Sequence, residues 1–183
     1  SYNNDGTVES KQTFQGKDDD SSWARGQAWA IYGYTACFRE TNDSIFLNFA
    51  KDIANMIMDR VKTEDAIPYW DYDAPVTKET PRDVSAASVT ASAMIELSTM
   101  VPDGQKYLDY SEKILKSLSS DAYLAKVGDN QGFILMHSVG SLPNGSEIDT
   151  PLNYADYYYL EALKRFMGLK KLRVEHGELR MIQ

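Results

Sequence analysis

Residues 22–41 read SWARGQAWAIYGYTACFRET, and this segment decides the fold class of the chain. A three- and four-residue spacing, mostly of apolar and aromatic side chains, runs through Trp23, Gln27, Ala30, Ile31, Tyr34 and Phe38. That spacing places them on one face of an α-helix. The pattern therefore predicts a helix over residues 22–41, with Ser21 or Ser22 as its N-cap.

The start of this predicted helix also carries unusual chemistry. Trp23 and Trp29 are surfaces on which a sugar ring can stack, and Arg25 can hold a carboxylate. Gln15 and Gln27 can both donate to and accept from hydroxyl groups. Two interpretations are open from side-chain chemistry alone: a pocket for an acidic sugar, or a core in which Arg25 pairs with a structural aspartate.

The composition narrows the class of partner. The chain has 183 residues and a formal net charge of −8, which disfavours nucleic acid and anionic membrane surfaces as partners. The sequence contains no apolar run near the roughly 20 residues that span a bilayer, and no signal peptide is expected. The first residue is Ser1, which favours a further segment upstream. The compartment stays open between cytoplasm and periplasm.

Cysteine and histidine usage predicts neither a disulfide nor a metal site. Cys37 is the only cysteine, and the helical pattern predicts that it is a small core residue rather than a nucleophile. His137 and His176 lie far apart in the sequence without a metal-spaced partner. We therefore expect no metal and no cofactor.

The remaining helices follow in an alternating order. Crowded helices rich in small or aromatic residues are predicted at 22–41, 83–100 and 150–168, and amphipathic ones between them at 45–57 and 105–119. A strand is expected within Gly132–Val139, and Thr150-Pro151 reads as the start of the fifth helix, which Gly168 closes. Residues 169–183 are expected to be a frayed helix or a disordered tail. The alternation is typical of stacked helical hairpins, and both a linear solenoid and a closed toroid fit it.

Three separated segments carry a more specific resemblance. They are Trp23–Trp29, then Ile67–Pro75 with Arg82-Asp83 and Ser85–Ala87 after it, and His137–Gly140 leading to Tyr154–Leu163. In this order they resemble glycoside hydrolase family 88, the unsaturated glucuronyl hydrolases, over roughly residues 5–168. The resemblance implies an all-α (α/α)6 toroid of paired helices. It also implies that residues 1–168 are the C-terminal part of one toroid domain, about half of the ring.

The resemblance implies a hydration reaction rather than displacement at the anomeric carbon. The substrates are lyase-derived oligosaccharides whose terminal uronate carries a C4=C5 double bond. An aspartic acid protonates C4, water adds at C5, and the resulting hemiketal opens to release the saccharide. An acid with that task needs a raised pKa.

The resemblance assigns recognition, but not catalysis, to this chain. Both family aspartates and a pocket histidine would lie upstream of Ser1. The positions that match the family's pocket are Gln15, Trp23, Arg25 and Trp29, with Gln27 as a weaker candidate. Arg25 would meet the uronate carboxylate, and the loop 138–147 would face the second sugar or its sulfate.

Other acidic residues are better explained as structural. Asp71 and Asp73 lie in an aromatic loop and could pass for a pair of catalytic carboxylates, but capping of backbone N–H groups is the favoured interpretation. Arg82 and Asp83 would pair with each other or cap the third helix. The run Asp18–Asp20 is typical of a solvated loop.

Two functions from different classes follow. The first is the recognition part of an unsaturated glucuronyl hydrolase. The second is a non-catalytic helical-repeat module that binds an acidic sugar or a partner protein. An open half-ring would expose apolar faces, which a second copy or the missing N-terminal half would cover.

Overall fold

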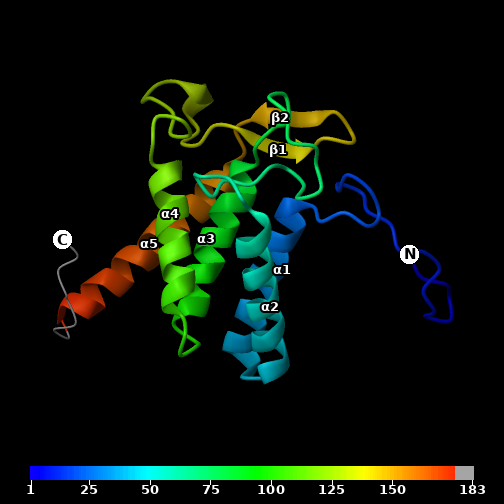
Figure 1. The fold of residues 1–183 in the computed structure, drawn as a ribbon, viewed down its shortest axis with the longest axis horizontal. Helices are drawn as coiled ribbons and strands as arrows, with labels where there is room; N and C mark the ends of the chain where they lie inside the picture. Colours follow the sequence, from blue (N-terminus) through cyan, green and yellow to red (C-terminus); the bar gives the residue numbers. More distant parts are fainter. Residues whose placement is uncertain (176–183) are drawn as a thin grey trace.

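The computed structural model describes residues 1–175 and contains five α-helices, one short 3-10 helix and one β-hairpin within them (Figure 1). In chain order the elements are α1 (Ala24–Thr41), α2 (Ser44–Arg60), α3 (Val84–Ser98), α4 (Gln105–Leu118), η1 (Asn130–Gly132), β1 (Ser138–Ser141), β2 (Ser146–Thr150) and α5 (Asn153–Glu175). No helix in this part of the chain is long and apolar enough to cross a membrane.

The helices form two layers around α3. Helix α3 packs against α1, α4 and α5, while α2 packs mainly against α1. Thus α1, α3 and α5 form one layer, and α2 and α4 lie outside it as the second members of helical hairpins. The predicted alternation of crowded and amphipathic helices matches this arrangement.

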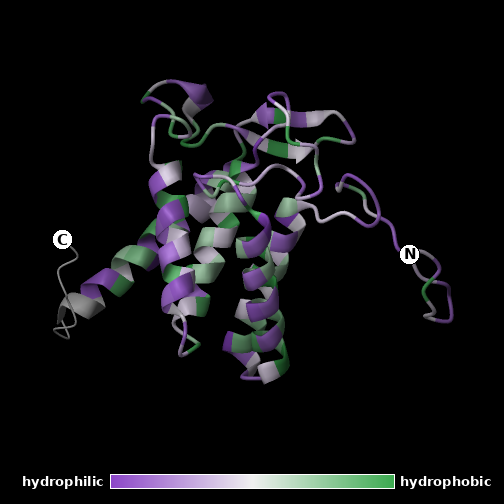
Figure 2. Cartoon of the chain, in the orientation of Figure 1, coloured by the Kyte–Doolittle hydropathy of each residue, from purple (hydrophilic) through white to green (hydrophobic). Residues whose placement is uncertain are grey.

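The small side chains of α3 explain its central position. It buries 13 of its 15 residues, whereas α4 keeps a polar face toward solvent. Figure 2 shows this contrast, because α3 is mostly pale or green and α4 carries long purple stretches. Alanine and serine allow neighbouring helices to approach closely from several sides. Asp83 caps its first turn by accepting hydrogen bonds from the backbone N–H groups of Ser85 and Ala86.

Two apolar clusters flank α3. One contains Ile95 with residues of α4 and α5 such as Leu118 and Tyr159. The other contains Met94 with Ile31 of α1, together with residues of α2 and α4. Neighbouring residues of α3 thus enter different clusters, and α3 joins them into one continuous core.

The loops and the hairpin gather at one end of the helices (Figure 1). Strand β1 is buried and pairs antiparallel with the exposed strand β2. The amide of Val84 donates to the carbonyl of His137, and the amide of Ala24 donates to the carbonyl of Trp70. These bonds tie the hairpin and the 62–82 loop to the first turns of α3 and α1, the place where the candidate site residues lie.

Several sequence predictions about boundaries are wrong. Thr150 ends β2 instead of capping the fifth helix, which begins at Asn153 and continues through Gly168 to Glu175. The strand predicted within Gly132–Val139 begins only at Ser138, because Gly132 and His137 have positive φ angles of 87° and 66° that interrupt extended backbone. Residues 176–183 of the predicted tail lie outside the described residues, and the domain boundary at 168 stays a prediction.

Two predictions about α1 are also corrected. Its N-cap is Trp23 rather than Ser21 or Ser22, and no side chain caps the helix. The Ser21 hydroxyl bonds to Asp18 and Asp71, and that of Ser22 accepts from Arg60. Cys37 is exposed rather than a core residue. The buried face of α1 is centred on Ala28, Ile31 and Thr35, and Cys37 lies outside it.

Candidate functional site

Arg25 is the centre of the candidate site. It lies in the first turn of α1 and is only 3% exposed. Its Nη1 donates to the Asp83 carboxylate at 3.0 Å and to the carbonyl of Val139, and its Nη2 donates to the carbonyl of Gly140. The guanidinium thus joins the starts of α1 and α3 to the buried strand of the hairpin.

Asp83 completes this junction from the other side. Its carboxylate is fully buried, caps α3 and also accepts hydrogen bonds from the Ser85 hydroxyl and the backbone N–H of Val139. Burial raises the pKa of Asp83, while the Arg25 guanidinium and the Ser85 hydroxyl act in the opposite direction. The interpretation in which Arg25 pairs with a structural aspartate therefore describes its contacts, with Asp83 as the partner.

Gln15 and Trp23 converge on the same place. The Gln15 side chain donates to the Gly140 carbonyl at 3.0 Å, so this oxygen accepts from both Gln15 and Arg25. The guanidinium carbon of Arg25 lies 4.7 Å from the centre of the Trp23 ring. That distance gives a cation–π contact between them.

Trp29 joins this group through an aromatic side chain of α5. The Tyr154 ring lies 5.4 Å from the Arg25 guanidinium and 6.3 Å from the Trp29 ring. Trp29 also packs against Tyr158. The Gln27 side chain, by contrast, forms no hydrogen bond with the rest of residues 1–175. Four of the five predicted site residues are therefore brought together, and Gln27 is separate from them.

The structure adds residues to the site that side-chain chemistry did not single out. They are Tyr154, Asp83 and Gly140, which lie in the motifs of the resemblance; from the sequence, Asp83 had only a pairing or capping role and the other two had none. At Gly140 an added Cβ would lie 2.2 Å from the Glu147 carboxylate and 2.6 Å from Glu147 Cβ, so only glycine lets β2 cover β1 so closely. This steric need is a signal that the sequence alone does not show.

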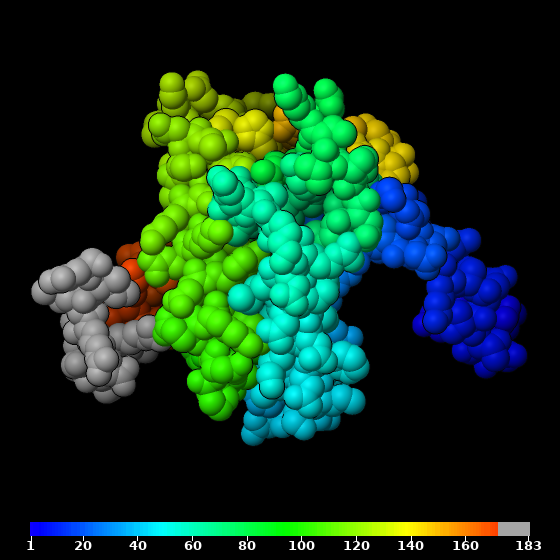
Figure 3. Space-filling model, in the orientation of Figure 1, coloured from blue at the N-terminus to red at the C-terminus, as the bar shows by residue number. Residues whose placement is uncertain are grey.

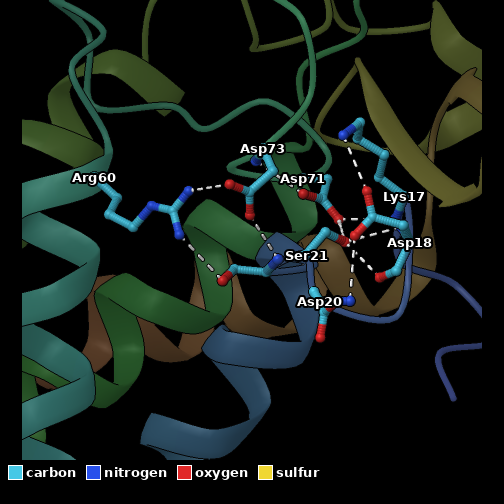
Figure 4. A network of polar contacts seen from close by, with 8 residues as sticks. Lys17, Asp18, Asp20, Ser21, Arg60, Asp71 and Asp73 are labelled. Atoms are coloured by element: carbon cyan, nitrogen blue, oxygen red, sulfur yellow. Dashed lines mark hydrogen bonds and ion pairs between the residues drawn. The ribbon is translucent and has the colours of Figure 1, made fainter. Parts of the chain in front are cut away.

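The acidic loop residues have structural roles, as predicted. Asp71 is fully buried and accepts hydrogen bonds from the backbone N–H groups of Lys17 and Asp73 and from the Ser21 hydroxyl (Figure 4). Asp73 accepts from the backbone N–H of Ser22 and from Arg60. The hydrogen bond from Arg60 is the main cause that lowers the pKa of Asp73.

Other charged side chains of these loops also contact partners within the chain. Asp18 pairs with Lys17 in an exposed loop. Arg82 does not pair with Asp83; it donates to the carbonyl of Ile67 and lies 3.5 Å from Asp65. The residues described by the structure contain no group of three or more His, Cys, Asp or Glu side chains that could hold a metal ion.

Fold and site together define a class of protein: paired helices whose loop end carries a cluster of aromatic side chains around a buried arginine. No family model matches the chain. Individual proteins of known function, however, are clearly similar to it. An unsaturated glucuronyl hydrolase of Formosa agariphila is 47% identical over 165 residues, which are 90% of this chain and 41% of that protein.

Solved structures agree with this relationship. The crystal structure of an unsaturated glucuronyl hydrolase specific for heparin has a TM-score of 0.91 and 56% identity, over 93% of this chain and 47% of that one. A Streptococcus agalactiae enzyme variant, complexed with dGlcA-GalNAc6S, has a TM-score of 0.79 and 33% identity over 90% and 45% of the two chains. The chain thus spans less than half the length of these relatives.

The resemblance to the unsaturated glucuronyl hydrolases is therefore confirmed. The predicted fold class, part of a paired-helix toroid, is confirmed by the same structures, which cover almost all of this chain.

Proposed function

We propose that this chain supplies the substrate-recognition part of an unsaturated glucuronyl hydrolase. The substrate would be a lyase-derived oligosaccharide that ends in a C4=C5 unsaturated uronate. The observation that carries the proposal is the convergence of Gln15, Trp23 and Arg25 beside the Gly140 carbonyl, although Gln15 and Gly140 are 125 residues apart in the sequence.

Each of these side chains would have a different part in recognising the sugar. The partly exposed Trp23 ring offers a face on which a sugar ring can stack, while Arg25 supports that ring from inside. Both terminal nitrogens of Arg25 are used by contacts within the chain and the guanidinium is buried, so its positive charge would attract the uronate carboxylate from beneath the Trp23 ring. Asp83 keeps this buried guanidinium in place by pairing with it.

Catalysis is assigned to residues outside this chain. Asp71 and Asp83 are both fully buried, and each is occupied by several hydrogen-bond donors from the surrounding structure. A general acid must reach the reacting carbon, which neither carboxylate can do in this arrangement. As the resemblance implies, the proton for C4 would come from an aspartic acid that another part of the complete enzyme supplies.

The recognition proposal is tested by the affinity of the chain for an unsaturated chondroitin disaccharide, measured by isothermal titration calorimetry. Trp23→Ala should weaken binding by about tenfold, because stacking on one aromatic ring is worth on the order of 1–1.5 kcal/mol. Phe49→Ala, which removes an aromatic side chain that is 48% exposed on α2, is the matched control. Equal affinity of all three proteins would contradict the proposal.

The same proposal requires a cover for one face of α5. Tyr157, Leu160 and Met167 are 59%, 51% and 68% exposed, and their spacing places them on one side of the helix. An apolar stripe of this kind favours association. Either a second copy of the chain or another part of the complete enzyme would cover it. A size measurement by light scattering that gives a stable monomer at high concentration would contradict association of two copies.

A further inference from the structure

A basic groove lies at the end of α2, outside the site described above. It consists of two adjoining cavities of about 400 and 560 Å³ that share Tyr69, Val76 and Arg82 in their walls. The C-terminal end of α2 and the 62–82 loop form these walls, and both lie on the face shown in Figure 3. We call this feature the loop groove.

The loop groove concentrates positive charge on an acidic protein. Arg60, Lys62, Lys78 and Arg82 all line it, although the chain has a net charge of −8. Arg60 pairs with Asp73, and Arg82 lies near Asp65. Lys62 and Lys78 are exposed and form no ion pair with the described residues. These two ammonium groups are therefore available to an anionic ligand.

Aromatic rings lie between these charges. The Arg82 guanidinium carbon lies 4.5 Å from the centre of the Tyr69 ring, and that of Arg60 lies 5.9 Å from the Tyr72 ring. Val76 adds an apolar side chain that is 74% exposed. Aromatic rings and cationic side chains thus lie together in the walls of the groove, and Tyr69 is the ring shared by both cavities.

The loop groove is separate from the Trp23 cluster, although one segment of chain contributes to both. The Asp71 carboxylate accepts hydrogen bonds from the backbone N–H of Lys17 and from the Ser21 hydroxyl, and Asp71 forms a β-bridge with Trp23. Tyr69 and Tyr72, on either side of it in sequence, instead line the groove. The groove can therefore be tested without touching Gln15, Trp23 or Arg25.

We propose that the loop groove binds a segment of an acidic polysaccharide chain. Lys62 and Lys78 meet its carboxylate or sulfate groups, and Tyr69 contacts the face of a sugar ring. Such a groove would hold a longer saccharide outside the recognition site and goes beyond the proposed function.

The test uses saturated oligosaccharides, which lack the unsaturated uronate that the Trp23 cluster is proposed to bind. A heparin-derived hexasaccharide carries sulfates and carboxylates, and a hyaluronan hexasaccharide carries carboxylates alone. Binding of each to the chain is measured by calorimetry at about 0.15 M salt, where the screening length is about 8 Å. We expect K62E/K78E to weaken binding about tenfold or more, since two charge-assisted contacts are replaced by repulsion.

The matched control is K113E/K126E, which makes the same change of charge at two exposed lysines outside the groove. It should change the affinity by less than about threefold, because exposed charges at a distance are screened by salt. Binding of heparin alone assigns sulfate as the recognised group, and binding of both oligosaccharides shows that a carboxylate suffices. K62E/K78E should leave the affinity for the unsaturated disaccharide unchanged, which separates this test from that of the proposed function.

Three results would overturn the proposal. The first is that neither oligosaccharide binds. The second is an equal loss of affinity in the groove variant and the control variant. The third is that a single-stranded DNA of matched length binds as strongly as the oligosaccharides. Far-UV circular dichroism of each variant confirms that the helices are intact.

Discussion

Replacing Arg25 by methionine should destabilise the whole fold. Arg25 and Asp83 are 3% and 0% exposed, and their side chains are joined by an ion pair of 3.0 Å. In R25M the Asp83 carboxylate and the carbonyls of Val139 and Gly140 stay buried but lose the guanidinium as a hydrogen-bond donor. Removing one partner of a buried pair costs about 3–5 kcal/mol. In a chain of this size that corresponds to a fall in Tm of roughly 6–20 °C.

The free energy of unfolding in urea, followed by far-UV circular dichroism, tests this prediction. The set comprises R25M, D83N and R25M/D83N, since asparagine can still cap α3 while removing the charge. The double variant should lose less than the sum of the single variants, because the two side chains interact directly. R39M is the matched control; its side chain is 46% exposed and pairs with Glu40 and Glu96. We expect it to cost under about 1 kcal/mol.

A loss below about 1 kcal/mol for R25M would refute the reasoning, because the guanidinium would then not be needed to hold Asp83. Strict additivity of the two single variants would refute it as well. Either result would leave ligand binding as the better explanation for an arginine at this position.

Three shorter predictions concern neighbouring residues. Asp71→Ala should cost at least about 2 kcal/mol in urea unfolding, since two backbone N–H groups and a hydroxyl lose their buried acceptor; a neutral effect would contradict the capping role. Arg60 is the main cause that lowers the pKa of Asp73 below 3.8 in the folded state. The contribution of Asp73 to stability is therefore present above about pH 4 and is lost as the pH falls through the lowered pKa. Asp73→Asn should make the free energy of unfolding depend less on pH in this range, and an unchanged dependence would count against this reasoning. Cys37, which is exposed, should react with a thiol reagent in the native state as fast as in urea, and strong protection would contradict its placement.

The helices could be predicted from the sequence because their apolar spacing is regular. The predicted ranges 83–100 and 105–119 differ from α3 and α4 by at most two residues at either end. The hairpin was not predictable in this way. Its strands contain the left-handed residues Glu147 and Asp149, with φ angles of 52°, and its register has an irregularity near Ser138. Such backbone features depend on contacts made after the chain has folded.

Only the part of the site that lies on one short segment could be predicted from the sequence. The spacing of Trp23, Arg25 and Trp29 on one short segment is visible in the sequence. The bond from Gln15 to Gly140, in contrast, joins residues 125 positions apart. The sequence left open whether Asp83 would pair with Arg82 or cap α3. Only the packing of α1 on α3 shows that it both caps α3 and pairs with Arg25.

The central claim is that this chain recognises an unsaturated uronate but lacks the acid that hydrates it. The most direct test is to incubate the chain with an unsaturated chondroitin disaccharide and follow the ultraviolet absorbance of the C4=C5 double bond. The account predicts that the absorbance stays constant while the folded chain binds the disaccharide. Loss of absorbance that is slowed in a folded Trp23→Ala variant would contradict it, because a catalytic acid would then lie within these residues.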